Sequence, residues 1–454
     1  MKFRLFVVMV LLIAFAVGCS STSGSNSGSE ASGSGTPSKN NEAVSNGDKE
    51  VELTFFYPVG VGGPLAKLIE DQTQEFMKEY PNIKLNPVFS GNSAETMTKT
   101  ITAIQGGTPP DFAILPNSEL YTFLSMNAIA PLDDFIAKDG GSAYIEDFLP
   151  ALMANSVYDN KIWSIPFQRS TVVAFYNKDH FREAGLDPDS PPKDWNELAE
   201  AATKLTKKDS NGNVSQWGIM IPLDDPFAFM GFGMQNSANG ENLMTEDGKK
   251  ALFNTPENVE ALQFTVDLSK KYGAMPEGPI KWETAPANFI EGKASIIYTS
   301  TGNLANIMKN ADFEVGTAFL PQGKRYGSPT GGANLFIFKS SPPEHQEAAW
   351  KFIRWITEPA RTAQWNIDTG YIATRNSAYE LDIMKNYYAE VPQAKVARDQ
   401  LDYAGSEIRL YDNGSNLKII KDAIAAALTG TKTPEKALED AQAQSDKVLE
   451  PFNK

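Results

Sequence analysis

From Val51 onward, short runs rich in β-branched and aromatic residues alternate with segments of helical periodicity. Residues 51–58, 82–89 and 110–115 have the composition of strands, and amphipathic segments at 64–77, 94–107 and 117–128 follow them. Alternating strands and helices predict an α/β domain with a largely parallel sheet. The alternation continues to about residue 452 of 454, a length beyond which a single core stops growing, so we expect two lobes.

The N-terminus has the pattern of a secretory signal. A short basic stretch with Lys2 and Arg4 precedes an apolar run that is too short for a typical membrane-spanning helix. Residues 16–19, Ala-Val-Gly-Cys, resemble the bacterial lipobox, with Ala16 where leucine is usual. We therefore expect residues 1–18 to be a lipoprotein signal peptide and Cys19 to be lipidated. The alternative is an ordinary signal peptide that contains a cysteine.

Residues 19–48 are rich in glycine and serine and contain almost nothing to bury, which predicts a disordered tether after the lipidated cysteine. Lipid and tether together would hold the folded part at the outer face of the cell membrane. Cys19 is the chain's one cysteine, so disulfides are excluded as a source of stability.

The formal net charge of -15 argues against nucleic acid and anionic lipid surfaces as partners. The acids are dispersed along the chain, which is typical of a soluble surface. Aromatic residues make up 11% of the sequence, and flat apolar rings are one requirement of a sugar-binding site.

Several kinds of catalytic and metal site lack support in the sequence. The two histidines, His180 and His345, lie far apart and outside any zinc-binding spacing, and no nucleophile-elbow, P-loop or dinucleotide-binding motif occurs. We expect no metal, no cofactor and no enzymatic activity. A glycosidase stays open as an alternative because 56 acids allow a carboxylate pair somewhere in the fold.

A glycine-rich turn with Gly60, Gly62 and Gly63 joins the first expected strand to its helix. Such a turn lets a ligand approach the backbone, and the helix behind it offers free N–H groups. The other interpretation is a tight strand-to-helix connection without a ligand.

Five segments resemble the extracellular solute-binding proteins of carbohydrate ABC transporters, especially the maltose- and glycerol-3-phosphate-binding branches. The Tyr-Asn-Lys-Asp sequence at 176–179 is a specific part of the likeness. The resemblance runs in order from about residue 50 to 430 and is carried by residues 107–115, 165–205, 289–307, 330–338 and 369–376.

The resemblance implies a two-lobed, type II periplasmic-binding-protein-like fold with ligand held between the lobes. Lobe 1 would comprise residues 50–167 and 335–371, and lobe 2 residues 168–334 and 372–454. The chain would cross between lobes near 167–171, 331–335 and 371–375, where small residues can absorb hinge motion.

The resemblance and the expected cleft loops together nominate a set of ligand-binding residues. They are Tyr57, Glu95, Asn117, Arg169, Ser170, Asp225, Phe229, Ser300, Thr301, Gly332, Tyr371 and Arg375, with Asn92, Glu119 and Gly331 as further polar or backbone contacts.

Three of these assignments carry alternatives. Phe229 stands where the glycerol-phosphate binders have a stacking tryptophan, although for any single aromatic here, Phe227 and Trp163 included, a place in the core is favoured. Arg169 and Arg375 either clamp an anionic ligand or pair with acids such as Asp225 or Asp368. The phosphate-clamping arginine of that branch has no clean counterpart, and Lys421 is the cation nearest in sequence.

The expected function is that of a membrane-anchored, monomeric receptor that captures a sugar or oligosaccharide and delivers it to an ABC permease. A receptor for glycerol-3-phosphate or glycerophosphodiesters is the alternative within the same class. From other classes, a carbohydrate-active enzyme would require a carboxylate pair in the cleft, and an adhesin or structural lipoprotein would show no closure on a small molecule.

Overall fold

The computed structural model describes residues 49–59, 61, 64–240 and 243–453. The expected signal peptide, Cys19, the tether and Gly60, Gly62 and Gly63 lie outside the described residues. Lys49–Lys454 form one compact unit.

The described strands form one ten-stranded sheet and one two-stranded sheet. The order in the large sheet is β2-β1-β3-β11-β6-β9-β8-β7, with β10 beside β6 and β12 beside β11. The strands are β1 (Val51–Tyr57), β2 (Ile83–Phe89), β3 (Phe112–Pro116), β4 (Val157–Tyr158), β5 (Lys161–Ile162), β6 (Ile165–Asn177), β7 (Lys207–Lys208), β8 (Val214–Met220), β9 (Ala294–Ser300), β10 (Val315–Ala318), β11 (Ser328–Ile337) and β12 (Ala404–Ser406).

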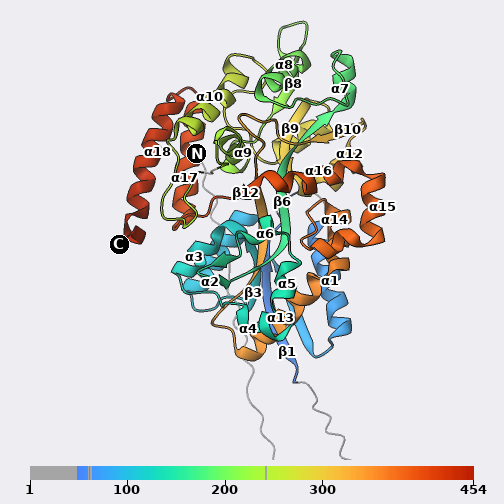
Figure 1. The fold of residues 1–454 in the computed structure, drawn as a ribbon, viewed down its shortest axis with the longest axis vertical. Helices are drawn as coiled ribbons and strands as arrows, with labels where there is room; N and C mark the ends of the chain where they lie inside the picture. Colours follow the sequence, from blue (N-terminus) through green and yellow to red (C-terminus); the bar gives the residue numbers. More distant parts are fainter. Residues whose placement is uncertain (1–48, 60, 62–63, 241–242, 454) are drawn as a thin grey trace, which may run out of the picture. The chain divides into compact units, whose positions relative to one another are not determined.

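Helices lie on both sides of the large sheet (Figure 1). They are α1 (Leu65–Glu79), α2 (Ser93–Gln105), α3 (Leu120–Ser125), α4 (Asp133–Lys138), α5 (Ser142–Glu146), α6 (Pro150–Met153), α7 (Lys178–Glu183), α8 (Trp195–Leu205), α9 (Pro226–Asn236), α10 (Pro256–Lys270), α11 (Thr284–Ile290), α12 (Leu304–Asn310), α13 (Pro343–Ile356), α14 (Pro359–Thr369), α15 (Asp382–Glu390), α16 (Pro392–Gln400), α17 (Asn413–Leu428) and α18 (Pro434–Leu449). Short 3₁₀ turns are η1 (Asn117–Glu119), η2 (Thr301–Asn303), η3 (Asn376–Glu380), η4 (Leu401–Tyr403) and η5 (Glu450–Asn453).

The middle of the large sheet differs from the largely parallel arrangement that the sequence predicts. β1 is parallel to β2 and β3, and β8 is parallel to β9. Between these groups, β11 runs antiparallel to β3 and β6, and β6 runs antiparallel to β9. The prediction assumed that each strand is followed by a helix, whereas β6 and β11 are long strands that carry the chain from one end of the sheet to the other.

Apolar side chains form two main cores at opposite ends of the sheet. One core gathers residues from Leu53 to Phe167 and from Ala333 to Tyr371, with a satellite cluster under α2 and α3. The other gathers residues from Val172 to Leu320 and from Ala394 to Leu449. We call the parts built on these cores the first half and the second half.

The three expected crossing segments lie side by side where the halves join. Thr171 pairs with Thr330, Arg169 pairs with Gly332, and Ile372 forms a bridge to Arg169. Gly332 has a φ of +97°, and a Cβ atom there would lie 1.9 Å from the carbonyl oxygen of Gln168. Only glycine fits this close approach between the crossing strands without strain.

Candidate ligand-binding cleft

Two of the cavities that open along the boundary between the halves form the candidate site. The Trp282 cavity has a volume of about 400 Å³ and is lined by Val59, Val61, Asn92, Trp282, Glu283, Pro286, Ala287, Ile290, Asn303 and Asn306. The Glu407 cavity has a volume of about 560 Å³. Its walls come from α2 and residues 116–122 on one side, and from Asp225, Glu407 and the first turns of α17 on the other.

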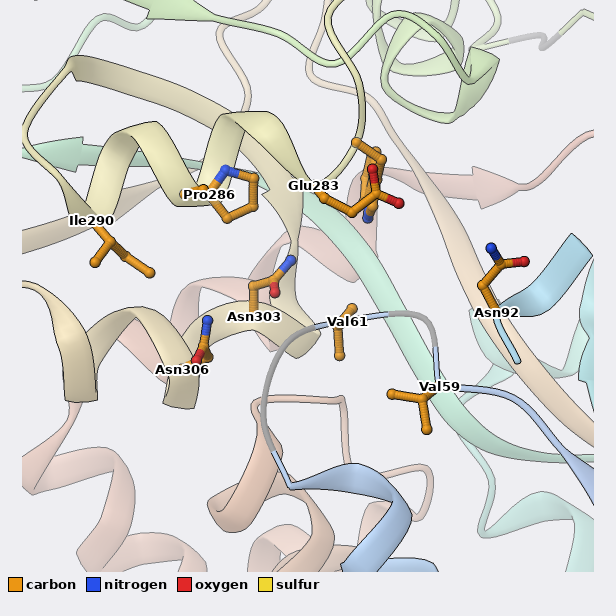
Figure 2. Close-up of a pocket in the computed structure, with 10 residues that line it drawn as sticks. Val59, Val61, Asn92, Glu283, Pro286, Ile290, Asn303 and Asn306 are labelled. Atoms are coloured by element: carbon orange, nitrogen blue, oxygen red, sulfur yellow. The ribbon is translucent and has the colours of Figure 1, made fainter. Parts of the chain in front are cut away.

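The Trp282 cavity combines an apolar wall with amide groups. Figure 2 shows Val59, Val61 and Asn92 of the first half across the space from Pro286 and Ile290, with Asn303 and Asn306 on η2 and α12 beside them. The Trp282 ring lies 5.8 Å from the ring of Phe227. Phe227 in turn lies over Gly331, where a Cβ atom would be 2.4 Å from the ring.

The Glu407 cavity is rich in carboxyl groups. Glu119, Asp225, Glu407, Asp412 and Asp422 line it, together with Lys418 and Lys421. Both lysines are paired: the ammonium of Lys418 lies 2.6 Å from Asp422, and that of Lys421 lies 3.6 Å from Asp225.

Two amide–carboxyl pairs cross the boundary beside this cavity in opposite directions. Asn117 of the first half donates to Glu407 at 3.2 Å, and Asn413 of the second half donates to Glu119 at 3.0 Å.

Burial, and then the charge of Asp225, raises the pKa of Glu407 to about 8. Burial also raises the pKa of Glu119. A carboxyl group that stays protonated near neutral pH acts as a hydrogen-bond donor as well as an acceptor.

Arg169 is fully buried at the crossing and is held by protein acceptors. Its guanidinium donates to the carbonyl oxygens of Gly331 and Leu152 and to the side chain of Asn334, at 2.8 to 2.9 Å. Burial lowers the pKa of Arg169 to about 9. Its hydrogen-bond partners are thus neutral groups at the crossing, and the alternative that Arg169 pairs with an acid such as Asp225 or Asp368 is wrong.

Arg375 is also engaged within the protein. It forms an ion pair with Asp147 at 3.1 Å, and its guanidinium lies 4.5 Å from the Tyr144 ring and 4.6 Å from the Phe148 ring. Only 8% of the residue is exposed. Of the two alternatives for Arg375, the structure shows pairing with an acid, and that acid is Asp147 of the first half, next to the crossing, instead of Asp225 or Asp368.

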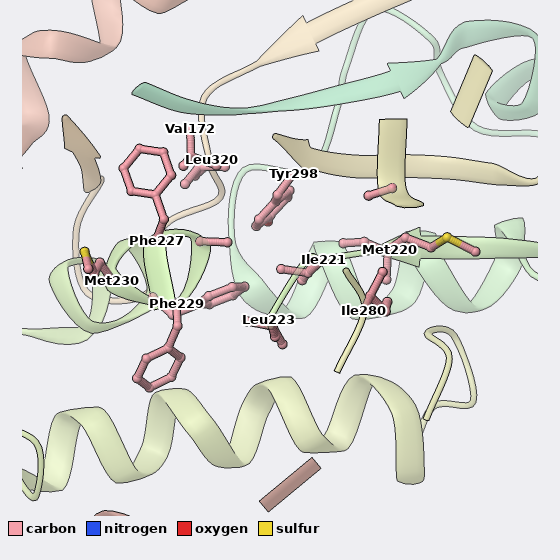
Figure 3. Packing of buried hydrophobic residues seen from close by; sticks show 14 of the residues in the cluster. Val172, Met220, Ile221, Leu223, Phe227, Phe229, Met230, Ile280, Tyr298 and Leu320 are labelled. Atoms are coloured by element: carbon pink, nitrogen blue, oxygen red, sulfur yellow. The ribbon is translucent and has the colours of Figure 1, made fainter. Parts of the chain in front are cut away.

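Three aromatic residues in the nominated set lie in the cores. Tyr57 and Phe229 are fully buried, and Tyr371 is 5% exposed, with its ring against Gly302. Figure 3 shows Phe227 and Phe229 on α9 among the buried side chains of the second core. Phe229 presents no face to either cavity in this state, whereas its neighbour Phe227 contacts the cavity-lining Trp282.

The nominated polar residues make mostly local contacts. Asn92 and Glu95 bond each other as the capping box of α2, and the Asp225 side chain caps α9 through the N–H of Phe227. Ser300 accepts from Gly302, and Thr301 accepts from the N–H of Thr171. Ser170 is buried in the ladder opposite Gly331.

The structure brings Asn117, Asp225, Gly332 and Glu119 to one region of the boundary. Asn117 donates to the carbonyl oxygen of Gly332 at 2.8 Å as well as to Glu407. The cleft residues that were not predicted from the sequence include Trp282, Asn303, Asn306 and Glu407. Asn303 and Asn306 directly follow the end of β9, so the rule that ligands bind at the carboxyl ends of strands could have found them. Trp282 comes from an irregular segment that carries no such signal, and Glu407 directly follows β12, a short strand that the sequence pattern did not predict.

Comparison with known proteins identifies the chain's relatives. The model of the bacterial extracellular solute-binding protein family matches residues 71–393. The chain belongs to the bacterial extracellular solute-binding protein family. The predicted membership and the function of a solute-binding protein of an ABC importer are thereby confirmed.

Its curated relatives include the sn-glycerol-3-phosphate-binding periplasmic protein UgpB of Salmonella typhimurium, which is 30% identical over 409 residues, 86% of this chain and 91% of the relative. The same protein of Escherichia coli K12 is 28% identical and covers 90% of this chain and 95% of its own. Both relatives are periplasmic binding proteins for sn-glycerol-3-phosphate.

Solved structures show the same fold. UgpB from Mycobacterium tuberculosis in complex with glycerophosphocholine matches 89% of this chain and 99% of its own, with a TM-score of 0.76 and 24% identity. The MalE domain from Bdellovibrio bacteriovorus bound to maltotriose matches 88% and 100%, with a TM-score of 0.76 and 23% identity. The predicted two-lobed α/β fold of this solute-binding protein is confirmed. None of its described helices is both long and apolar enough to cross a bilayer.

Proposed function

We propose that this solute-binding protein captures a neutral, hydroxyl-rich solute, a sugar or an oligosaccharide, in the cleft formed by the Trp282 and Glu407 cavities, and delivers it to an ABC permease. The observation that carries the proposal is the engagement of the two arginines that were candidates for binding an anion. Arg169 and Arg375 are buried and bonded to protein groups.

The lining of the cavities supports the same ligand class. Among the described residues, neither cavity has an arginine in its wall, and the polar lining consists largely of amide, hydroxyl and carboxyl groups. Such groups donate to and accept from sugar hydroxyls. The apolar wall around Trp282 suits the C–H faces of a sugar ring.

The alternative is a phosphate ester such as glycerol-3-phosphate or a glycerophosphodiester, which the names of the curated relatives favour. Lys418 and Lys421 are the cations available at the Glu407 cavity. A bound phosphate would have to compete with Asp422 and Asp225 for them, in a cavity that carries three further carboxyl groups.

A ligand screen by thermal shift decides between the two. We expect neutral oligosaccharides to raise the melting temperature, because a ligand at 100 times its Kd adds about 2.7 kcal/mol to the free energy of unfolding. Lys421→Met serves as the matched variant. It should leave the shift with a neutral sugar unchanged and reduce a shift with a phosphate ester. A response to phosphate esters alone that this variant removes would contradict the proposal.

We propose that capture works by closure of the two lobes, with lobe 1 at residues 50–167 and 335–371 and lobe 2 at 168–334 and 372–454. The division into two cores supports these boundaries. A solute that contacts both lobes stabilises the closed state by the contacts that the open state lacks. We propose that one chain suffices for capture, since both walls of the cleft belong to it.

We also propose that Cys19 carries the lipid that anchors the receptor outside the cell membrane. The lipobox-like sequence and the Gly/Ser-rich residues after it support this proposal. Cells expressing the chain and fed a labelled fatty acid should incorporate the label, and Cys19→Ser should abolish the incorporation and release the protein from the membrane fraction. Label retained in Cys19→Ser would contradict it.

A further inference from the structure

Four aromatic rings, three stacked and one edge-on, form a continuous cluster across the boundary between the halves, beside the Glu407 cavity. Tyr411 of the second half lies between Tyr121 and Phe452, with ring centroids 4.9 Å and 4.8 Å apart and interplanar angles of 26° and 20°. Tyr158 meets Tyr121 edge to face at 5.3 Å, and the hydroxyl of Tyr411 donates to that of Tyr158 at 3.2 Å.

The rings belong to different halves. Tyr121 lies on α3 between Leu120 and Phe123, and Tyr158 packs against the same cluster of the first half. Tyr411 and Phe452 pack against the second core. The contact between Tyr121 and Tyr411 therefore joins two separately packed bodies.

Polar contacts reinforce the cluster at its edges. The hydroxyl of Tyr121 donates to the carbonyl oxygen of Glu246 at 3.0 Å, and Arg409 donates to the carbonyl oxygen of Ala154. A Cβ atom at Gly248 would lie 2.6 Å from the Tyr121 ring, so glycine there lets the second half approach this ring closely.

These contacts lie outside the crossing segments, so they have to separate or slide when the lobes open about the crossings. We propose that the four-ring cluster of Tyr121, Tyr158, Tyr411 and Phe452 is a latch that holds the two halves together at the Glu407 cavity and limits how far the empty cleft opens. The proposal does not depend on the identity of the solute. The latch stabilises the closed state through contacts within the protein, in addition to the contacts that a bound solute makes with both halves.

Aromatic pairs contribute enough for their loss to be measured. An aromatic pair contributes about 0.5–1.5 kcal/mol beyond its buried area, which corresponds to about a two- to tenfold change in the ratio of open to closed molecules. Loss of the latch should therefore increase the open fraction of the solute-free protein by about that factor.

The experiment measures the distance between the halves without any ligand. Spin labels are placed at Lys84→Cys on β2 and Glu435→Cys on α18, two exposed sites, with Cys19 replaced by serine because it is the chain's one cysteine. In Tyr411→Ala the pulsed-dipolar distance distribution should gain a longer component. Tyr411→Phe, which keeps the ring cluster and loses the hydroxyl, should stay close to the parent.

Tyr403→Ala is the matched control. Tyr403 contacts Phe319 and Tyr326 at 6.0 Å and 5.4 Å in a ring cluster away from α3, so its loss removes aromatic contacts without touching the latch. An unchanged distribution in folded Tyr411→Ala, or an equal change in Tyr403→Ala, would overturn the proposal.

If Tyr411→Ala fails to fold, Phe452→Ala decides the question. Phe452 is partly exposed near the C-terminus, and its ring stacks on Tyr411 within the second half. Its loss should therefore shift the distance distribution between the spin labels in the same direction as the loss of Tyr411.

Discussion

Replacing Arg169 by methionine is expected to lower the free energy of unfolding by about 2–4 kcal/mol, because each buried acceptor left without a donor costs about 1–3 kcal/mol and removal of the desolvated guanidinium offsets part of that cost. Methionine approaches the length of arginine and donates no hydrogen bond. The carbonyl oxygens of Gly331 and Leu152 and the side chain of Asn334 would lose their bonds to the guanidinium while staying buried. An unpaired buried acceptor keeps its full desolvation cost.

Equilibrium unfolding in urea measures this effect. Arg182→Met is the control, because Arg182 is half exposed and pairs with Asp179 and Glu314 on the surface, where an ion pair contributes about 0–1 kcal/mol. If Arg169→Met kept the stability of the parent and lost only ligand affinity, Arg169 would be a ligand clamp, and the main observation in favour of a neutral solute would no longer hold.

The second large effect is a fall in stability with rising pH that depends on Glu407. Burial and the nearby Asp225 raise the pKa of Glu407 from 4.5 to about 8 in the folded protein. Between these two values the folded state binds a proton that the unfolded state has released, so the free energy of unfolding decreases as pH increases. The contribution is complete below about pH 4.5 and is lost by about pH 8.

The expected loss between pH 5 and pH 8 is about 2–4 kcal/mol, since each pKa unit corresponds to about 1.4 kcal/mol. Glu407 is partly exposed to the cavity that it lines, and this exposure lowers the effect toward the lower part of the range. Glu119 changes stability in the same direction, because burial raises its pKa as well.

Glu407→Gln tests this prediction, because a glutamine oxygen still accepts from Asn117 and carries no titrating proton. The variant should be more stable than the parent at pH 8 and should lose less stability between pH 5 and pH 8. Exposed Glu200 provides the control, and Glu200→Gln should keep the pH profile of the parent. Parallel profiles for Glu407→Gln and the parent would show that Glu407 does not titrate in this range.

Much of the local structure could be predicted because it depends on neighbouring residues. Asp194 caps α8 through the N–H groups of Asn196 and Glu197, as the spacing of Asp194 and Glu197 predicts. β1, β2 and β3 form the expected parallel group. The direction of β6 and β11 was not predictable in the same way, since their antiparallel partners lie more than 100 residues away along the chain.

The site was harder to predict than the fold. Tyr57 and Phe229 are residue types that serve equally in a core and in a sugar site, and their burial decides for the core in this state. Trp282 lines the cavity and packs against Phe227, which in turn lies over Gly331, and these residues come from separate segments of the chain. No local pattern around Trp282 encodes that arrangement.

The α/β class, the acidic and disulfide-free character of the chain and its likeness to solute-binding proteins were all evident before any coordinates, because they follow from composition, periodicity and local motifs. The folded protein was needed to show that Arg169 is bonded at the crossing and that Asn117 meets Glu407 across the boundary. Hydrogen-bond partners and the pKa of a buried carboxyl group depend on distances between segments that are far apart in the chain. Those distances exist only after the two halves have packed.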